Sequence, residues 1–320
     1  MKSINKIIIF TSLSLCSFIS KAQDDGKVII NTIYDEPRKN AWNVGIALGL
    51  DLQNKTSGGL YYLLHGRYTL GKLMTFNVNA AMDLTKLTGT NGIISASEVY
   101  KKIDPFMHLE GRASFHLSDK IGEVKSKVSL GGDGKYNYST NYTSKNRSVM
   151  GVTASLNIHH HVGGQSADSA SDKRAYNVKI GNITGYKENT FINQKNMILG
   201  IGFFVGDYTH SKHKFTAGPV GTKKRKLKRS MTTSIEFLLG LNMNMGSKAY
   251  WVENSQVKEA EISDVEKKRM GFRLVADYGK NKVGWFQHFE LGLRPGLYSP
   301  NSQSKYLNQG FLNWGFGFGF

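Results

Sequence analysis

The chain is poor in cysteine, proline and long hydrophobic runs, and each shortage excludes a class of structure. It has one cysteine, Cys16, and five prolines in 320 residues. Cys16 lies in an N-terminal segment that we expect to be removed, so disulfides cannot hold the mature fold. The most apolar later run, MILGIGFFVG at 197–206, has ten residues, three of them glycine. A membrane-spanning helix needs about 20 apolar residues, so we expect none after the N-terminal segment.

That N-terminal segment, residues 1–22, has the three parts of a secretory signal peptide. It begins with lysines, continues with an apolar stretch at 7–20, and ends with Ser20 and Ala22 at the −3 and −1 positions of a cleavage site. The alternative is a membrane-anchoring helix, for which the apolar stretch is short. A lipoprotein is excluded because Leu15 precedes Cys16, where lipid attachment requires a small residue. Removal of Lys2, Lys6 and Lys21 lowers the formal net charge from +18 to +15.

The rest of the composition favours strands. The chain has 35 glycines, 15 tyrosines and 17 phenylalanines, and aromatic residues favour pleated surfaces while glycine serves tight corners. The mean hydropathy is −0.34. That value does not exclude a membrane barrel, because the two faces of its alternating strands cancel in an average.

Alternation of apolar and polar residues is the main structural signal. In 42–51 the even positions are apolar and the odd positions are Asn, Gly, Ala and Asp; segments 73–83, 148–159, 234–245 and 269–278 also alternate. These runs have ten to twelve residues, which is long for a soluble strand but matches the nine to eleven or so residues with which a tilted strand crosses a bilayer. Aromatic residues lie toward strand ends, as in a membrane-interface girdle: Trp42, Tyr68, Tyr208, Tyr278 and Trp285.

The sequence therefore predicts an all-β protein, a transmembrane antiparallel up-and-down β-barrel of about 12 strands, with 10–14 possible. Residues 1–22 are the expected signal peptide, 23–41 a periplasmic N-terminal segment and 42–320 the barrel. The expected strands are 42–51, 59–70, 73–85, 104–117, 123–132, 147–161, 174–186, 196–209, 230–246, 268–279, 283–298 and 310–320.

The lengths of the connections predict which side of the membrane each one faces. Gly71-Lys72, 118–122 and 279–282 are short enough for periplasmic turns. The alternate connections, 86–103, 133–146, 247–267 and 299–309, are longer and polar, as outer loops are. Two connections, 163–173 and 210–229, are too long for the tight turns that this scheme requires, so they are either periplasmic projections or hide a missed pair of strands.

The chain ends in an alternating aromatic strand that carries Trp314, Phe316, Phe318 and the terminal Phe320. This end resembles the C-terminal insertion signal of Gram-negative outer-membrane β-barrel proteins, and the Lys- and Asn-rich loops look like those of Bacteroidota barrels. The resemblance implies location in the outer membrane, contact with its lipid and lipopolysaccharide, and recognition by the barrel-assembly machinery. It identifies no functional subfamily.

Charged residues on the polar parity are the candidate lining of the lumen: His65, Arg67, Asp83, His108, Glu110, Arg112, His116, Glu236, Arg273, Asp277, His288, Glu290 and Arg294. Buried charges need partners, and this row contains both signs. The favoured interpretation is a lumen largely filled by ion pairs, in a structural or accessory component of an envelope complex whose protein partner is not identified. The alternative is a small porin-like diffusion channel that prefers anions. A lipid hydrolase that uses His108 and His288 is the remote alternative.

The remaining motifs do not indicate an enzyme or a cofactor. His159, His160 and His161 are consecutive, so along a strand they point to opposite faces and at most two of them converge; we expect no metal. The densest basic run is a predicted loop containing Lys223, Lys224, Arg225, Lys226, Lys228 and Arg229. After a signal peptide, nucleic acid is not its expected partner. Lipid phosphates, an acidic periplasmic partner and simple solvation all remain open.

Overall fold

A computed structural model describes residues 28–37, 41–53, 57–83, 107–132, 137–165, 177–180, 183–186, 190–217, 221–254, 256–264, 266–280, 284–298 and 310–319. The fold is all-β, and the described residues form no helix. They accordingly include no helix long and apolar enough to cross a membrane. The expected signal peptide and the predicted loops 86–103 and 299–309 lie outside the described residues.

Sixteen strands are described. Their bounds are β1 Ile29–Asp35, β2 Ala41–Gln53, β3 Ser57–Leu70, β4 Met74–Asp83, β5 Met107–Gly132, β6 Asn137–Gln165, β7 Asn177–Ile180, β8 Ile183–Tyr186, β9 Thr190–Ala217, β10 Gly221–Glu253, β11 Gln256–Asp264, β12 Glu266–Lys268, β13 Met270–Lys280, β14 Gly284–Leu293, β15 Gly296–Tyr298 and β16 Gly310–Gly319. The described residues form two compact units: unit 1 contains 28–34, 124–132, 137–144, 212–217 and 221–225, and unit 2 contains the other described residues.

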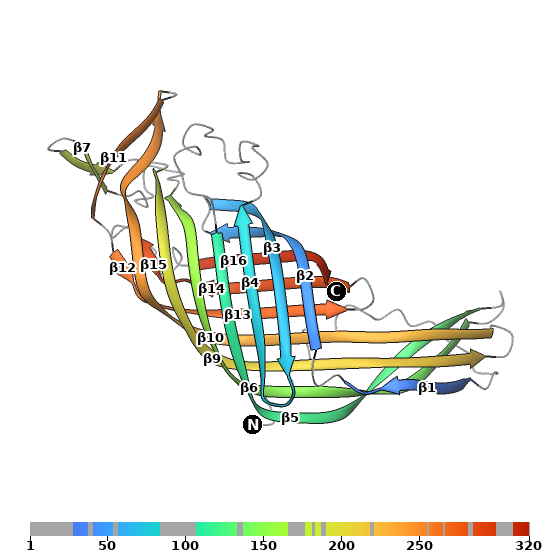
Figure 1. The fold of residues 1–320 in the computed structure, drawn as a ribbon. Coiled ribbons are helices and arrows are strands. Elements are labelled where there is room, and N and C mark those ends of the chain that lie inside the picture. The colour runs from blue at the N-terminus through green and yellow to red at the C-terminus, as the bar shows by residue number, and fades with distance from the viewer. Residues whose placement is uncertain are drawn as a thin grey trace. The chain divides into compact units, whose positions relative to one another are not determined.

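In unit 2 a large antiparallel sheet curves round into a ring (Figure 1). The strands pair in the order β9-β6-β5-β4-β3-β2-β16-β14-β13-β10, and β9 also pairs with β10, so the order returns to its start. Among the described residues the ring thus has ten strands, at the lower end of the predicted range. The C-terminal strand β16 lies between β14 and β2, so it joins the two ends of the chain in the sheet.

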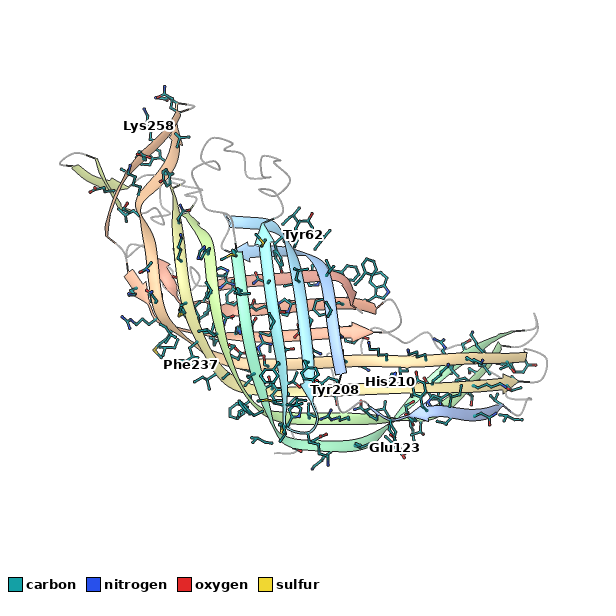
Figure 2. The ribbon with its side chains drawn as sticks, viewed as in Figure 1. Tyr62, Glu123, Tyr208, His210, Phe237 and Lys258 are labelled. Carbon is teal, nitrogen blue, oxygen red and sulfur yellow. The ribbon has the colours of Figure 1, made fainter. Side chains whose placement is uncertain are left out.

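The ring follows the predicted alternation, with its apolar side facing out. In β2, Val44, Ile46 and Leu48 are 51%, 50% and 56% exposed, while Ala47 between them is 2% exposed. Tyr62 on β3 and Phe237 on β10 are also exposed, and their side chains are labelled in Figure 2. Part of the inner face is apolar as well, where Ala47, Tyr61, Leu63, Ala81 and Phe286 form a buried cluster.

Several predicted connections are wrong because strands continue through them. In the predicted outer loop 133–146, residues 137–146 belong to β6. The turn expected at 118–122 lies inside β5, which runs unbroken over 26 residues from Met107 to Gly132. The basic run at 223–229 is not a loop but part of β10, which has 33 residues. Most of the predicted outer loop 247–267 also forms strands, as the end of β10 pairs with β11. The connection Gly71-Lys72, in contrast, is a turn, and Gly71 has a φ of 54° that glycine adopts without strain.

Unit 1 has an ordinary apolar interior. Its buried residues Val128, Leu130, Tyr142, Phe215 and Ala217 come from β5, β6 and β9 and pack into one cluster. Strand β1, which the sequence did not predict, pairs with β9. The two units therefore differ from the expectation that 42–320 forms one barrel domain.

We predict that the seam between β16 and β2 tolerates no added side chain at Gly317. A Cβ there would run into the Ile46 carbonyl oxygen and the Ala47 Cα of β2. The substitution Gly317→Ala should lower the free energy of unfolding by about 1–3 kcal/mol, as overpacking does, measured by urea titration of the folded protein in detergent. Gly111→Ala is the matched control, because a Cβ at Gly111 meets nothing within 4 Å. Equal stability of the two variants would contradict close packing at the seam.

Candidate functional site

The interior of the ring carries most of the predicted lumenal charges. Buried there are His65, Arg67, His108, Glu110, Arg112, Glu236, Arg273, Asp277, His288, Glu290 and Arg294. They are buried because they share the parity of the strands that faces away from the exposed apolar side. His116 is half-buried at the end of the ring, where its ring nitrogen Nε2 lies 3.0 Å from Thr75 Oγ1. The side chain of Asp83 lies outside the described residues.

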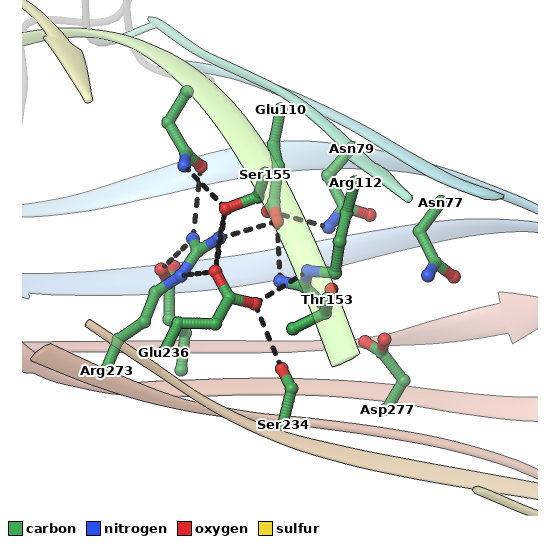
Figure 3. Close-up of polar contacts among 12 residues, drawn as sticks. Asn77, Asn79, Glu110, Arg112, Thr153, Ser155, Ser234, Glu236, Arg273 and Asp277 are labelled. Atoms are coloured by element: carbon green, nitrogen blue, oxygen red, sulfur yellow. Dashed lines mark hydrogen bonds and ion pairs between the residues drawn. The ribbon is translucent and has the colours of Figure 1, made fainter. Parts of the chain in front are cut away.

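Arg273 on β13 is the hub of this network (Figure 3). Its guanidinium lies 2.8 Å from Glu110 on β5, 2.8 Å from Glu236 on β10 and 2.7 Å from Glu290 on β14. It also donates hydrogen bonds to Asn157 Oδ1 at 3.1 Å and Ser155 Oγ at 3.0 Å. One buried cation on β13 thus ties four other strands, β5, β6, β10 and β14, to its own through charge-assisted bonds, which are the strong class of hydrogen bond.

The three carboxylates around Arg273 have further partners. Arg112 on β5 forms ion pairs with Glu110 and, at 3.0 Å, with Glu236. Ser155 donates to Glu236 at 2.7 Å, and Asn313 donates to Glu290 at 2.9 Å. Multiple donors to each carboxylate offset the cost of removing its charge from water.

A second cluster lies around Asp277 on β13. Arg67 on β3 donates to Asp277 Oδ2 at 3.1 Å, to Thr232 Oγ1 at 2.8 Å and to Asn77 Oδ1 at 2.9 Å. His288 Nδ1 lies 2.7 Å from the other carboxylate oxygen of Asp277. His65 hydrogen-bonds Asn79 at 2.6 Å and stacks on Phe286 with ring centroids 4.5 Å apart. Polar and aromatic groups therefore fill the space beside the ion pairs.

Several of these contacts join strands that are far apart in the ring. In the pairing order, β5 and β13 are four steps apart by the shorter way, and so are β3 and β13. Arg273 nevertheless touches Glu110, and Arg67 touches Asp277. Arg67 also reaches Thr232 on β10, which is five steps away and so opposite in a ring of ten. These side chains cross the interior rather than line one wall.

The two histidines of the lipid-hydrolase alternative contact acidic residues and another histidine. His108 lies 3.7 Å from Glu110 and edge-on to His159, with centroids 5.3 Å apart. His288 contacts Asp277. Within the described residues, no group of three metal-ligating side chains is placed to hold an ion.

Two polar sites were missed by the sequence analysis. At the end of the ring, Arg147 on β6 donates two hydrogen bonds of 2.9 Å to the Asp119 carboxylate and a further one to the Gly71 carbonyl oxygen. These bonds hold the pKa of the Asp119 carboxyl below its usual range, so the stability that they contribute is lost as the pH falls through that pKa. The sequence predicts a turn at 118–122, so it does not indicate the ion pair between Asp119 and Arg147.

The other missed site is in unit 1, where both ring nitrogens of His213 form hydrogen bonds with hydroxyl groups. Its Nε2 lies 3.0 Å from Ser144 Oγ, and its Nδ1 lies 3.2 Å from Thr32 Oγ1. His213 and Ser144 are 1% and 0% exposed. Tyr142 packs edge-on against the imidazole, with centroids 4.9 Å apart. The pair is closed to solvent and serves as a polar contact in the interior of this unit.

The remaining predicted residues lie on the outside of the molecule. Trp314 and Phe318 on β16 are exposed and Phe316 is half-exposed, while Phe320 lies outside the described residues. On β10, Lys223, Lys224, Arg225 and Arg229 are exposed, and Lys226 and Lys228 are partly exposed. Lys223 donates to the carbonyl oxygen of Ser129 at 3.1 Å.

No protein-family model matches this chain, and no curated protein matches it either. The geometry described above is therefore the basis for assigning a function.

We predict that removing the charge of Arg273 destabilises the ring strongly, because three buried carboxylates lose a partner. Arg273→Met should lower the free energy of unfolding by about 3–5 kcal/mol, as breaking a buried ion pair does. Arg269→Met is the control, since Arg269 lies nearby in the chain but is exposed, and it should change stability by about 0.5 kcal/mol or less. Urea titration in detergent measures both, and similar values for the two variants would contradict the role of Arg273 as a hub.

Proposed function

We propose that this chain is an outer-membrane β-barrel with a closed, filled lumen, which serves as a structural or accessory component of an envelope complex. The observation that carries the proposal is the set of ion pairs that cross the interior of the ring. Arg273–Glu110 and Arg67–Asp277 each join strands four pairing steps apart. A barrel of about eight strands is just filled by its own side chains, while barrels of about sixteen leave an aqueous channel. A ten-stranded ring with long crossing residues belongs with the filled class.

The exposed face of the ring supports its place in a membrane. Large apolar side chains are exposed on every second residue of the ring strands, whereas soluble proteins rarely expose broad apolar patches. Aromatic residues also lie beside one another in the cross-strand register, where Trp42 is opposite Tyr68 and Tyr68 is opposite Phe76. Trp285 lies opposite Phe318. Rows of this kind suit a membrane–water interface.

The connections suggest the orientation. The turn after β3, the end of β13 and the start of β14 lie at the ring end where the chain enters β2. Short turns and both ends of the chain face the periplasm in outer-membrane barrels. Strands β5, β6, β9 and β10 continue into unit 1 from that same end. This proposal therefore assigns unit 1 to the periplasm.

An anion-preferring channel is the second candidate, favoured by the arginines in the interior. Arg67, Arg112 and Arg273 are each within ion-pair distance of a carboxylate, which cancels most of their field on a passing anion. Arg294 lies over the ring of Phe311, with its guanidinium carbon 4.0 Å from the centroid. These contacts make the filled lumen the better-supported candidate.

We predict that a lysine placed in the exposed apolar band is costly only if that band contacts lipid. Leu48→Lys, at a residue that is 56% exposed, should make folding into lipid vesicles less favourable by about 2–4 kcal/mol. Ile121→Lys is the control, because Ile121 is 59% exposed but follows the ring end in β5. It should cost about 1 kcal/mol or less. A small effect at both positions would indicate that the band faces water.

We predict that the purified protein conducts little current in planar lipid bilayers. The double variant Arg67→Ala, Arg273→Ala removes both crossing cations and should raise the conductance several-fold. Large, stable open channels in the unaltered protein would contradict a filled lumen. The channel hypothesis predicts instead an anion selectivity that disappears when Arg67, Arg112, Arg273 and Arg294 are all neutralised.

A further inference from the structure

Unit 1 has an unusual balance of charge. Its described residues contain seven basic side chains and no acidic one: Lys125, Lys127, Lys212, Lys214, Lys223, Lys224 and Arg225. Lys214 and Lys224 lie on one face of the β9–β10 hairpin. Thr216 and Thr222 lie opposite one another, because their hydroxyls are 3.2 Å apart. Two residues farther from the connection on each strand, 214 therefore lies opposite 224. Like charges directly opposite one another destabilise a sheet, so this arrangement favours an anionic partner.

Strand β1 forms one edge of the sheet in this unit. It pairs with β9, and no described strand pairs with its other edge. All five residues from Ile29 to Ile33 are exposed, including three isoleucines that are 53%, 37% and 49% exposed. Proteins usually protect such an edge with lysine, proline or a bulge. The sequence of β1, IINTIYD, contains neither lysine nor proline.

The two features occur together on one sheet. Thr32 bonds to buried His213 and Val28 packs against the interior cluster, so Ile29, Asn31 and Ile33 take the opposite face of β1. Phe215 and Ala217 are buried on β9, so Lys212 and Lys214 take the corresponding outer face. An apolar edge strand therefore lies next to a strand with cationic side chains on the same face.

We propose that unit 1 binds an extended acidic segment of a partner protein, which adds to the free edge of β1 as a further strand. Main-chain hydrogen bonds to β1 supply affinity, the isoleucines contact apolar side chains, and the lysines select carboxylates. A lipid surface offers no regular donors and acceptors for the β1 backbone. A second copy of this unit is disfavoured because both copies carry the same excess of positive charge.

The test uses the full chain folded in detergent and a dye-labelled ten-residue peptide of alternating Val and Glu, with binding followed by fluorescence anisotropy. The Val–Glu peptide should bind, and the corresponding Val–Lys peptide should not. Neutralising Lys212, Lys214 and Lys224 to Gln should weaken binding by about tenfold. The control neutralises the exposed cations Lys258, Lys267 and Arg269 of unit 2 and should leave binding unchanged. Equal effects of the two triple variants would overturn the proposal.

Strand addition is tested separately with two N-methylated forms of the peptide, one methylated at every Val amide and the other at every Glu amide. The amides of a strand alternate between its two edges, so one form should lose binding and the other should retain most of it. No difference between the two forms would overturn the proposal. So would binding to phosphatidylglycerol vesicles that depends on the three lysines in the absence of peptide binding. None of these results requires the ring to cross a membrane, so their failure would leave the proposed function intact.

Discussion

The burial of Arg273 with three carboxylates is the interaction on which the ring depends. A single buried carboxylate or guanidinium is costly to remove from water, and partners of opposite charge are needed to offset that cost. Here the partners come from β5, β10 and β14, which the ring must bring together before any of them is satisfied. The network therefore favours one arrangement of the strands over slipped alternatives, because a shift of one residue would turn every inward charge to the outer face.

The same constraint relates structure to function. A channel needs charges that line a wall and leave the axis open, whereas Arg67 reaches Thr232 on the opposite strand. Glycine and small residues make room for these long side chains. At Gly49, for example, any Cβ would overlap the ring of Tyr61, which is itself buried inside the ring. An interior packed in this way resists deformation, which supports the proposed scaffold role over the channel alternative.

The faces of the strands could be predicted from the sequence, but their lengths could not. Alternation identifies the inward side of residues such as Glu110 and Arg273 because a strand has a period of two whatever lies around it. It says nothing of partners, so the contact of Arg67 with Asp277 over 210 positions had to come from the structure. Residues 118–122 have turn-like composition, yet they form a strand because β5 continues into unit 1 and packs Val128 and Leu130 there. The composition of the basic run 223–229 likewise predicts a loop, yet the run belongs to β10. Tertiary pairing overrides local preference in both segments.

The chemistry of the two faces of strand β5 changes along its length. Its even positions are buried near both ends of the strand, but they are polar at Glu110 and Arg112 and apolar at Val128 and Leu130. Its exposed odd positions change in the opposite sense, from Leu109 and Phe115 to Lys125 and Lys127. A strand in one solvent has no physical reason to exchange the chemistry of both faces at once. Apolar residues outside and charges inside are stable against lipid, and the reverse is stable against water. The inversion is thus what a continuous strand requires if its residues in unit 2 face lipid and its residues in unit 1 face water.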